Sequence, residues 1–471
     1  MESNSFLDKA FDVKDFHDTG LSLVEFLTRT FENADKRLVL PYKTPVEQYE
    51  YWKKDFKEKG SPINLFKDVI DKSILYHHPH YMGYQTAVPA LPTVLASLVI
   101  DFLSNGMGVY DAGMVGNTME RVVCEHLCEK FAMGENAGGF VTSGGTLGTL
   151  TAILTAKAYY QYHISKDMAA ESDKLSILTS EQSHYCVERA AITMGISKDR
   201  VIKIPVDENY RVRVDALKES YQKVISKGKR IFCIIASAPS TSTGTYDNLE
   251  EIGKFCQMKN VWFHVDGAHG APAIFSEKYK YLVKGAEYAD SIVLDFHKMM
   301  LTPGISSAVL LKNRSYAFDT FRQEAEYLWR NQDFEWQHGG KSTFECTKSM
   351  TILKVYTLFK QFGDKIFEEF VDYQYDLTRE FARLIDENPL FEIAHQPDSN
   401  ILCFRYICCN NPNQFNTELR HRLTMDGNFF IVQTTLNGNI YLRITLLNPR
   451  TTITHIEHLL QSITIIAKNL G

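Results

Sequence analysis

The sequence lacks a hydrophobic run long enough to cross a membrane, and it lacks an excess of charge of one sign. Its most apolar stretch, Leu91 to Leu103, is too short to span a bilayer and contains Asp101. The formal net charge is −6, from 51 basic and 57 acidic residues, without a long run of either sign. A basic stripe for phosphate backbones is absent, so we expect neither a nucleic acid nor a membrane as a partner.

We expect neither a signal peptide nor a cysteine framework. The first four residues are polar and acidic rather than charged and then apolar. The nine cysteines are scattered, and neither Cys124 with Cys128 nor the adjacent Cys408 and Cys409 has a second pair at zinc-ribbon spacing. We therefore expect no bound metal, reduced thiols and a cytoplasmic location.

What is present is the composition of an ordinary globular protein, and 471 residues allow two to three domains at about 150 residues each. We predict a helical N-terminal segment over residues 1–65, a large α/β domain over 66–350 and a small α+β domain over 351–471. The N-terminal segment has little apolar mass of its own. We expect it to pack on another part of the molecule or on a second subunit.

The large domain is predicted from short, nearly continuous apolar runs, which are typical of strands buried on both faces. These runs cover residues 231–236, 261–266, 291–295 and 307–311. They predict a mostly parallel sheet covered by helices, and amphipathic stretches such as Asn248 to Met258 are long enough to be crossover helices.

The C-terminal part of the chain has a different pattern. Helical spacing dominates from Ser349 to Ile385. Strand-like runs at 401–406 and 440–445, followed by an amphipathic helix from about Ile453, predict the small domain.

A glycine-rich turn at residues 142–146 reads Thr-Ser-Gly-Gly-Thr and lies between a short strand-like run and a helical stretch. Backbone N–H groups and the helix dipole at such a position can cradle a phosphate. Taken alone, the segment fits at least as well a tight glycine turn with a hydroxyl helix cap.

Two charged residues follow predicted strands, at the edge where open α/β sheets bind ligands. Asp266 ends one run and can pair with a protonated ring nitrogen, although it can equally cap the next helix. Lys298 follows another run. In a buried, mostly apolar setting its pKa would be depressed and its amine would be a nucleophile for an aldehyde. The plainer interpretation is an exposed lysine at a helix start.

Two histidines accompany these residues. His184 follows a strand-like stretch and can stack on a planar ring, whereas a lone histidine is more often structural. His297 directly precedes Lys298 and can be a satisfied buried histidine.

The order of these features within one α/β domain resembles the group II pyridoxal-phosphate (PLP) decarboxylases, which have the aspartate-aminotransferase-like fold (fold type I). The resemblance runs from about His78 to the C-terminus. It is carried by His78-Pro79-His80-Tyr81-Met82-Gly83, the 142–146 turn, His264-Val265-Asp266-Gly267-Ala268, the His297-Lys298 pair, and Leu442-Arg443 followed by Asn448-Pro449.

The resemblance implies a role for each matching residue. Lys298 would hold PLP as a Schiff base, Asp266 would pair with the pyridine nitrogen, and His184 would stack on the ring. The implied contacts to the cofactor also include Gly145, Thr146 and His297 at the phosphate, Ser240 or Thr241 at the ring oxygen, and Ala268. Arg443 would bind the substrate α-carboxylate, and Thr86 would line the substrate pocket.

These assignments imply decarboxylation of an L-amino acid to the amine and CO2, in a homodimer with its sites at the subunit boundary. No basic clamp for a side-chain carboxylate is evident, which favours an aromatic or neutral substrate over glutamate. More distant alternatives are a carbon–carbon or carbon–sulfur lyase on the same fold, and a non-catalytic scaffold. The intact Lys298, Asp266 and Arg443 argue against a scaffold, which needs none of them.

The chain departs from the family in the segment 333–340, where relatives place a tyrosine that is thought to protonate Cα. No tyrosine occurs there, and Tyr327 lies upstream. His338 is the expected substitute acid, because the pKa of imidazole suits proton transfer near neutral pH. The missing tyrosine also implies an alternative reaction, oxidative decarboxylation and deamination to an aldehyde.

A second departure is Asp295, three residues before the lysine. A carboxylate there would lie near a phosphate, so we expect Asp295 to face away or to hydrogen-bond only through its neighbours.

Overall fold

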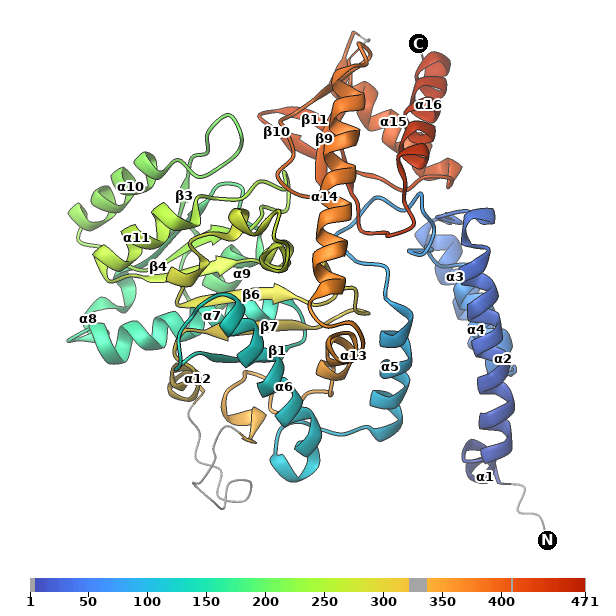
Figure 1. Cartoon of the computed structure of the whole chain (residues 1–471), viewed down its shortest axis with the longest axis horizontal. Helices are drawn as coiled ribbons and strands as arrows, with labels where there is room; N and C mark the ends of the chain where they lie inside the picture. The colour runs from blue at the N-terminus through green and yellow to red at the C-terminus, as the bar shows by residue number, and fades with distance from the viewer. Residues whose placement is uncertain (1–4, 322–336, 408–409, 471) are drawn as a thin grey trace. The chain divides into compact units, whose positions relative to one another are not determined.

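The computed structural model describes residues 5–321, 337–407 and 410–470 (Figure 1). These residues form two compact units. The larger unit comprises Gln85–Glu387 and Ile393–Cys403. The smaller unit comprises the described chain up to Tyr84, Asn388–Glu392 and the described chain from Phe404 onward.

The larger unit is built on a seven-stranded sheet with the order β1-β7-β6-β5-β4-β2-β3. Its strands are β1 (Gly138–Thr142), β2 (Leu175–Ser180), β3 (Val201–Ile204), β4 (Arg230–Ser237), β5 (Trp262–Asp266), β6 (Ser291–Asp295) and β7 (Ser307–Leu311). The strand β7 runs antiparallel to both of its neighbours, while the pairs from β6 through β3 are parallel. The predicted mostly parallel sheet is confirmed.

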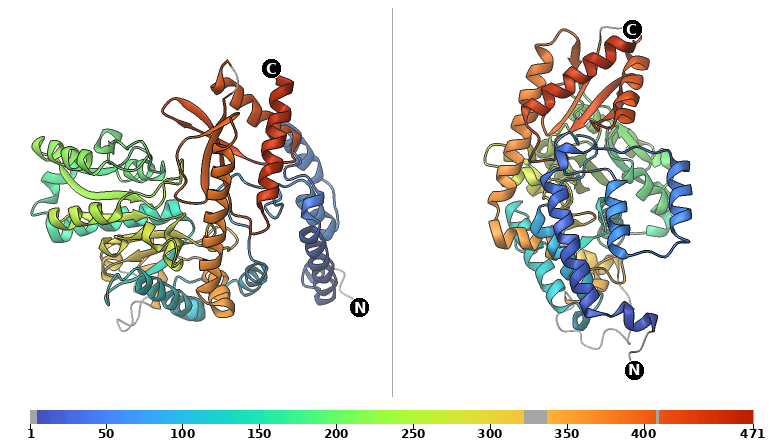
Figure 2. Two further views of the ribbon diagram at one scale, coloured as in Figure 1. Left: turned by 45° about the horizontal axis from the view of Figure 1, so that its top comes forward. Right: turned by 90° about the vertical axis from the view of Figure 1, so that its right-hand side faces the viewer.

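Helices surround this sheet, and some of them join its strands (Figures 1 and 2). They are α5 (Leu91–Leu103), α6 (Tyr110–Lys130), α7 (Gly145–Tyr159), α8 (Met168–Glu171), α9 (Cys186–Thr193), α10 (Val214–Ser226), α11 (Leu249–Lys259), α12 (Ser315–Thr320), α13 (Ile352–Phe362) and α14 (Lys365–Asp386). The predicted crossover helix at 248–258 is α11, and Asn248 caps it by accepting the N–H of Glu251.

Two adjacent residues of β5 show that helices cover both faces of the sheet. The ring of Tyr159, at the end of α7, lies 5.4 Å from the ring of Trp262. A side chain placed at Gly253 of α11 would instead meet Phe263. Successive strand residues point to opposite faces, so α7 and α11 lie on opposite sides of the sheet. This two-sided cover explains why the strands are apolar throughout.

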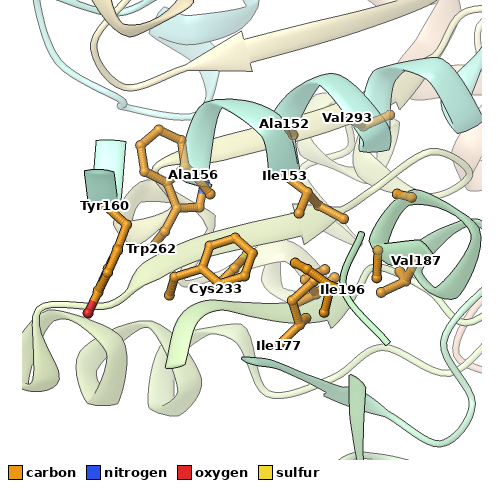
Figure 3. Packing of buried hydrophobic residues seen from close by; sticks show 14 of the residues in the cluster. Ala152, Ile153, Ala156, Tyr160, Ile177, Val187, Ile196, Cys233, Trp262 and Val293 are labelled. Carbon is orange, nitrogen blue, oxygen red and sulfur yellow. The ribbon is translucent and has the colours of Figure 1, made fainter. Parts of the chain in front are cut away.

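The core between α7 and the sheet is closely packed (Figure 3). Ala152, Ile153 and Ala156 of α7 pack with Ile177 of β2 and Cys233 of β4, and all five are fully buried. The small alanines let the helix lie close to the strands. That packing fixes where α7 begins and therefore positions its N-terminal turn.

The smaller unit contains the N-terminal helices and most of a second sheet. Its helices are α1 (Phe6–Ala10), α2 (Val13–Glu32), α3 (Pro45–Asp55), α4 (Pro62–Asp71), α15 (Pro412–Asp426) and α16 (Ile453–Leu470). The second sheet has the order β10-β11-β9-β8, with β8 (Phe391–Ile393), β9 (Ile401–Tyr406), β10 (Val432–Leu436) and β11 (Asn439–Thr445). The strands predicted at 401–406 and 440–445 are β9 and β11.

Across the described part of the chain, no helix combines the length and the apolar character that crossing a membrane would need.

Candidate active site

The carboxyl ends of the strands in the larger unit surround a cavity of about 330 Å³. Asp266 and Asp295 are the last residues of β5 and β6, and α7 begins at the same edge of the sheet. The lining residues are Ser143, Gly144, Gly145, Thr146, Thr149, His184, Cys186, Pro239, Thr241, Asp266, Ala268, His269, Asp295, His297, Lys298 and Ile305. This edge is where open α/β sheets bind their ligands.

Lys298 forms an ion pair at the base of this cavity. Its Nζ lies 2.8 Å from Oδ2 of Asp295, whose side chain is 2 % exposed. Burial alone would lower the pKa of the Lys298 ammonium, but the charge and hydrogen bond of Asp295 outweigh burial and raise that pKa above its ordinary value. The expectation of a depressed pKa in an apolar setting is therefore wrong, because the setting contains a buried carboxylate.

Asp295 faces the lysine, so the expectation that it faces away or bonds only through its neighbours is also wrong. Its carboxylate accepts a hydrogen bond from the Ser307 hydroxyl and lies 3.7 Å from Nε2 of His297. Burial would raise the pKa of this carboxyl, but Lys298 and His297 outweigh that effect and hold the pKa below its usual range. Asp295 is a buried anion that pairs with the Lys298 ammonium and lies close to His297.

Asp266 and His184 line the same cavity. One carboxylate oxygen of Asp266 accepts the N–H of Ala268 at 3.3 Å, which leaves the other oxygen available to a ring nitrogen. Nδ1 of His184 accepts the N–H of Cys186 at 3.3 Å, so the neutral imidazole carries its proton on Nε2. Burial lowers the pKa of His184, which keeps the ring neutral near pH 7.

The glycine-rich turn forms another part of the lining. Gly144 has a φ of 109°, which only glycine adopts readily, and α7 begins at Gly145. A Cβ at Gly145 would lie 2.7 Å from Oδ1 of Asp295, so only glycine lets the backbone come this close to β6. The turn thus presents the backbone N–H groups at the start of α7 to the cavity.

Four predicted site residues do not line this cavity. Ser240 is buried and its hydroxyl bonds that of Thr243, whereas the neighbouring Thr241 does line the cavity. Thr86 is next to Ala87, whose N–H donates to the carbonyl of His297 at 3.0 Å. Arg443 is buried on β11 in the smaller unit.

The fourth is His338, whose Nδ1 accepts the N–H of Tyr110 at 3.2 Å. The segment 337–340 is therefore held at the start of α6. Tyr327 and residues 333–336, on which the departure from the family was argued, lie outside the described residues.

Sequence reasoning assigned no role to His269, which is 2 % exposed and lines the cavity three residues after Asp266. Its Nε2 lies 2.7 Å from Oδ1 of Asn400. Asn400 directly precedes β9, and no signal in the sequence connects it to the site. His269 lies in the sequence segment that follows Asp266, but the sequence does not indicate which groups a histidine in a buried turn faces.

The cavity fits PLP. It offers an amine for the aldehyde, a carboxylate for the pyridine nitrogen and a glycine turn at a helix start for the phosphate. These groups are Lys298, Asp266 and Gly144–Thr146. A volume of about 330 Å³ is in the range of small-molecule sites.

Comparison with known proteins agrees with this fit. The pyridoxal-dependent decarboxylase conserved domain matches residues 63–407. The aromatic-L-amino-acid decarboxylase of Bacillus atrophaeus is 30% identical over 421 residues, which cover 86% of this chain and 85% of that protein. The L-2,4-diaminobutyrate decarboxylase of Acinetobacter baumannii is 28% identical, with 85% and 82% covered.

Solved structures show the same fold. The glutamate decarboxylase domain of a diaminobutyrate-pyruvate transaminase and L-2,4-diaminobutyrate decarboxylase from Vibrio parahaemolyticus has a TM-score of 0.86 at 25% identity, covering 96% of both chains. Oryza sativa TDC with PLP and tryptamine has a TM-score of 0.89 at 16% identity, covering 98% of this chain and 99% of that one.

The chain belongs to the pyridoxal-dependent decarboxylase family. It uses pyridoxal 5'-phosphate as its cofactor and decarboxylates an amino acid.

Proposed function

We propose that the substrate is an aromatic or other neutral L-amino acid and that the product is the corresponding amine. The charges of the cavity carry this proposal. Among its described lining residues, the charged side chains are Asp266, Asp295 and Lys298, accompanied by three histidines. The proposed roles below engage all three with the cofactor or with each other. None is then left to pair with a charged substrate side chain.

When bound, PLP supplies the electron sink for the electron pair left at Cα as CO2 departs. In our proposal Lys298 provides the amine that fixes the cofactor's aldehyde carbon. Asp266 holds a proton at the pyridine nitrogen, and the neutral His184 lies against the ring. This proposal is supported because all three side chains line the same cavity.

The cofactor's phosphate is assigned to the N–H groups of Gly145 and Thr146, with His297 beside them. This assignment rests on the glycine turn at the start of α7, where the helix dipole favours an anion. Thr241 takes the contact to the ring oxygen. Ser240 is the weaker choice, since its hydroxyl is engaged by Thr243. Ala268, which also lines the cavity, is assigned to the contact with the same ring.

Arg443 remains our proposal for the group that orients the substrate α-carboxylate, and Thr86 for the pocket wall. His338 is proposed as the acid that returns a proton to Cα. Because its Nδ1 accepts the N–H of Tyr110, the proton it can give is on Nε2.

We propose a homodimer formed through the exposed apolar face of α5. Its exposed large apolar residues are Leu91, Val94, Leu95, Leu98, Val99, Phe102 and Leu103. Apolar patches of this kind mark protein interfaces, and a second copy of the chain is the partner that the fold family favours. A cytoplasmic location is also proposed, in keeping with the free thiols of all seven described cysteines.

Oxidative decarboxylation is the second candidate reaction. It would consume O2 and water and give an aldehyde, CO2, ammonia and hydrogen peroxide. The observation that favours it is the absence of a tyrosine from residues 333–340. Without a fast proton donor, the electron pair at Cα can reach oxygen instead.

Mass spectrometry of the products separates these proposals. The PLP-loaded protein is incubated in air with single amino acids, including phenylalanine, dihydroxyphenylalanine, ornithine, diaminobutyrate, glutamate and cysteine sulfinate. We expect an amine from the aromatic substrates, and Lys298→Ala should lose both that amine and the visible absorbance of the bound cofactor. An amine from glutamate or diaminobutyrate alone would refute the substrate proposal, and an aldehyde with peroxide would establish the second candidate.

A further inference from the structure

A carboxylate already occupies the glycine-rich turn that we assign to the cofactor's phosphate. Oε1 of Glu345 lies 2.6 Å from the Ser143 hydroxyl oxygen, and Oε2 lies 3.3 Å from the Ser143 backbone nitrogen. Ser143 lines the cavity, whereas Glu345 reaches it from outside the lining. Both hydrogen-bond donors of Ser143 therefore point to one side chain.

The position of Glu345 is fixed by its neighbours. Lys348, three residues on, is 7 % exposed and donates to Glu120 at 2.7 Å and to the carbonyl of Val141 at 2.6 Å. Val141 lies in β1, two residues before Ser143, which directly follows that strand. The Thr343 hydroxyl donates to the carbonyl of Glu345 at 2.8 Å. Lys348 thus ties the segment to the end of β1, and the Thr343 hydroxyl fixes the backbone at Glu345 itself.

A serine hydroxyl has one hydrogen to donate. While Glu345 accepts it, the Ser143 hydroxyl cannot donate to a phosphate oxygen. The phosphate of PLP and the carboxylate of Glu345 are also both anions, so their charges repel when both lie at this turn. Glu345 thus keeps two donors at this turn from the phosphate, which we assign to the adjacent N–H groups of Gly145 and Thr146, and its charge disfavours the phosphate there.

We propose that Glu345 is an internal competitor of the cofactor's phosphate: it holds the two donors of Ser143 and weakens the affinity of the protein for PLP. The inference rests on the proposed phosphate role of the turn at Gly145 and Thr146. It assigns to Glu345 control over cofactor affinity rather than a part in the reaction itself.

Titration of the protein with PLP, followed by its visible absorbance, tests this proposal, with calorimetric binding of inorganic phosphate to PLP-depleted protein as a second readout. We expect Glu345→Ala to bind both ligands about fivefold more tightly, because a nearby like charge is removed and two donors are freed. Glu345→Gln should show a smaller gain, since its amide oxygen can still accept the Ser143 hydroxyl.

A double-mutant cycle adds a signature that a structural role would not give. Ser143→Ala should change PLP affinity little in the otherwise unaltered protein, but should remove much of the gain seen in Glu345→Ala. Glu277→Gln, which removes an exposed carboxylate paired with Lys280, is the matched control for total charge and should leave both affinities unchanged.

Weaker or unchanged binding in Glu345→Ala and Glu345→Gln would overturn the competitor role and make Glu345 a support of the turn. Thr146→Pro removes one of the two backbone N–H groups assigned to the phosphate, at a position in the first turn of α7 where proline is tolerated, and so distinguishes that result from failure of the underlying assignment. If Thr146→Pro weakens phosphate binding while the Glu345 variants do not strengthen it, only the present inference fails. If Thr146→Pro also has no effect, the phosphate does not bind at this turn and both fail.

Discussion

At the scale of single residues, the ion pair of Lys298 and Asp295 sets the charge of the amine on which the site depends. An amine attacks an aldehyde only when it is neutral. Asp295 holds the pKa of Lys298 above its ordinary value and so favours the ammonium. Capture of the cofactor should therefore become faster as the pH rises.

Asp295→Asn should shift this pH profile toward lower pH, because removing the carboxylate charge lowers the pKa of Lys298 and leaves more neutral amine at a given pH. The measurement is the rate at which visible absorbance appears after PLP is added, across a series of pH values. Asp290→Asn is the control: Asp290 precedes the other end of β6 and accepts the N–H of Phe263 at 2.8 Å. An unshifted profile in Asp295→Asn would show that this charge does not govern the amine.

Residue types at strand ends could be read from the sequence, but their partners could not. Lys298 and Asp266 were predicted for the site from their positions after buried runs, and both line the cavity. The partner of Lys298 was missed because three residues of separation do not say which way Asp295 points. Asn400 and Glu345 were missed because their contacts, to His269 and Ser143, join segments more than a hundred residues apart.

At the scale of elements, apolar patterns in the sequence predicted the strands and helices reliably, but they did not predict where one helix ends and the next begins. The strands predicted at 291–295 and 307–311 have those bounds in β6 and β7. The helical pattern predicted from Ser349 to Ile385 comprises two helices, α13 and α14, which are separated at Gly363. The apolar spacing continues across the break, so only the glycine itself marks it.

Gly363→Ala should lower the free energy of unfolding by about 1–3 kcal/mol, because the residue has a φ of 63° and a ψ of −157°, a conformation almost restricted to glycine. Denaturant-induced unfolding measures the change. Gly20→Ala adds the same methyl group inside α2, where nothing lies within 4 Å, and should be stabilising by about 1 kcal/mol at most. Equal effects of the two changes would show that the conformation of Gly363 is not what separates the helices.

At the scale of the whole molecule, the exposed apolar face of α5 is the feature that a single chain leaves unexplained. The side chains of Leu98 and Phe102 are 55% and 76% exposed, one helical turn apart. Helix α5 was visible in the sequence as the most apolar stretch. The sequence did not show that α5 exposes this surface, because apolar residues all around a helix predict burial but do not identify the partner that buries them.

Phe102→Asp should convert the proposed dimer to a monomer, because a buried unpaired carboxylate opposes association. Sedimentation velocity measures the outcome. Met258→Asp on α11, which changes a residue that is 73% exposed, should leave the oligomeric state unaltered. A protein that is monomeric without any substitution would refute the homodimer, and a dimer that persists in Phe102→Asp would place the interface elsewhere.

The antiparallel strand β7 has a consequence for the order in which the protein is made. At the edge of the large sheet, β1 pairs with β7 alone, and the register joins Gly138 to Leu311. A chain emerging from the ribosome must therefore be synthesised past Leu311 before β1 has its partner. The glycine turn that follows β1 takes its final place only then, so PLP can join the nascent protein late in synthesis and not guide its early folding.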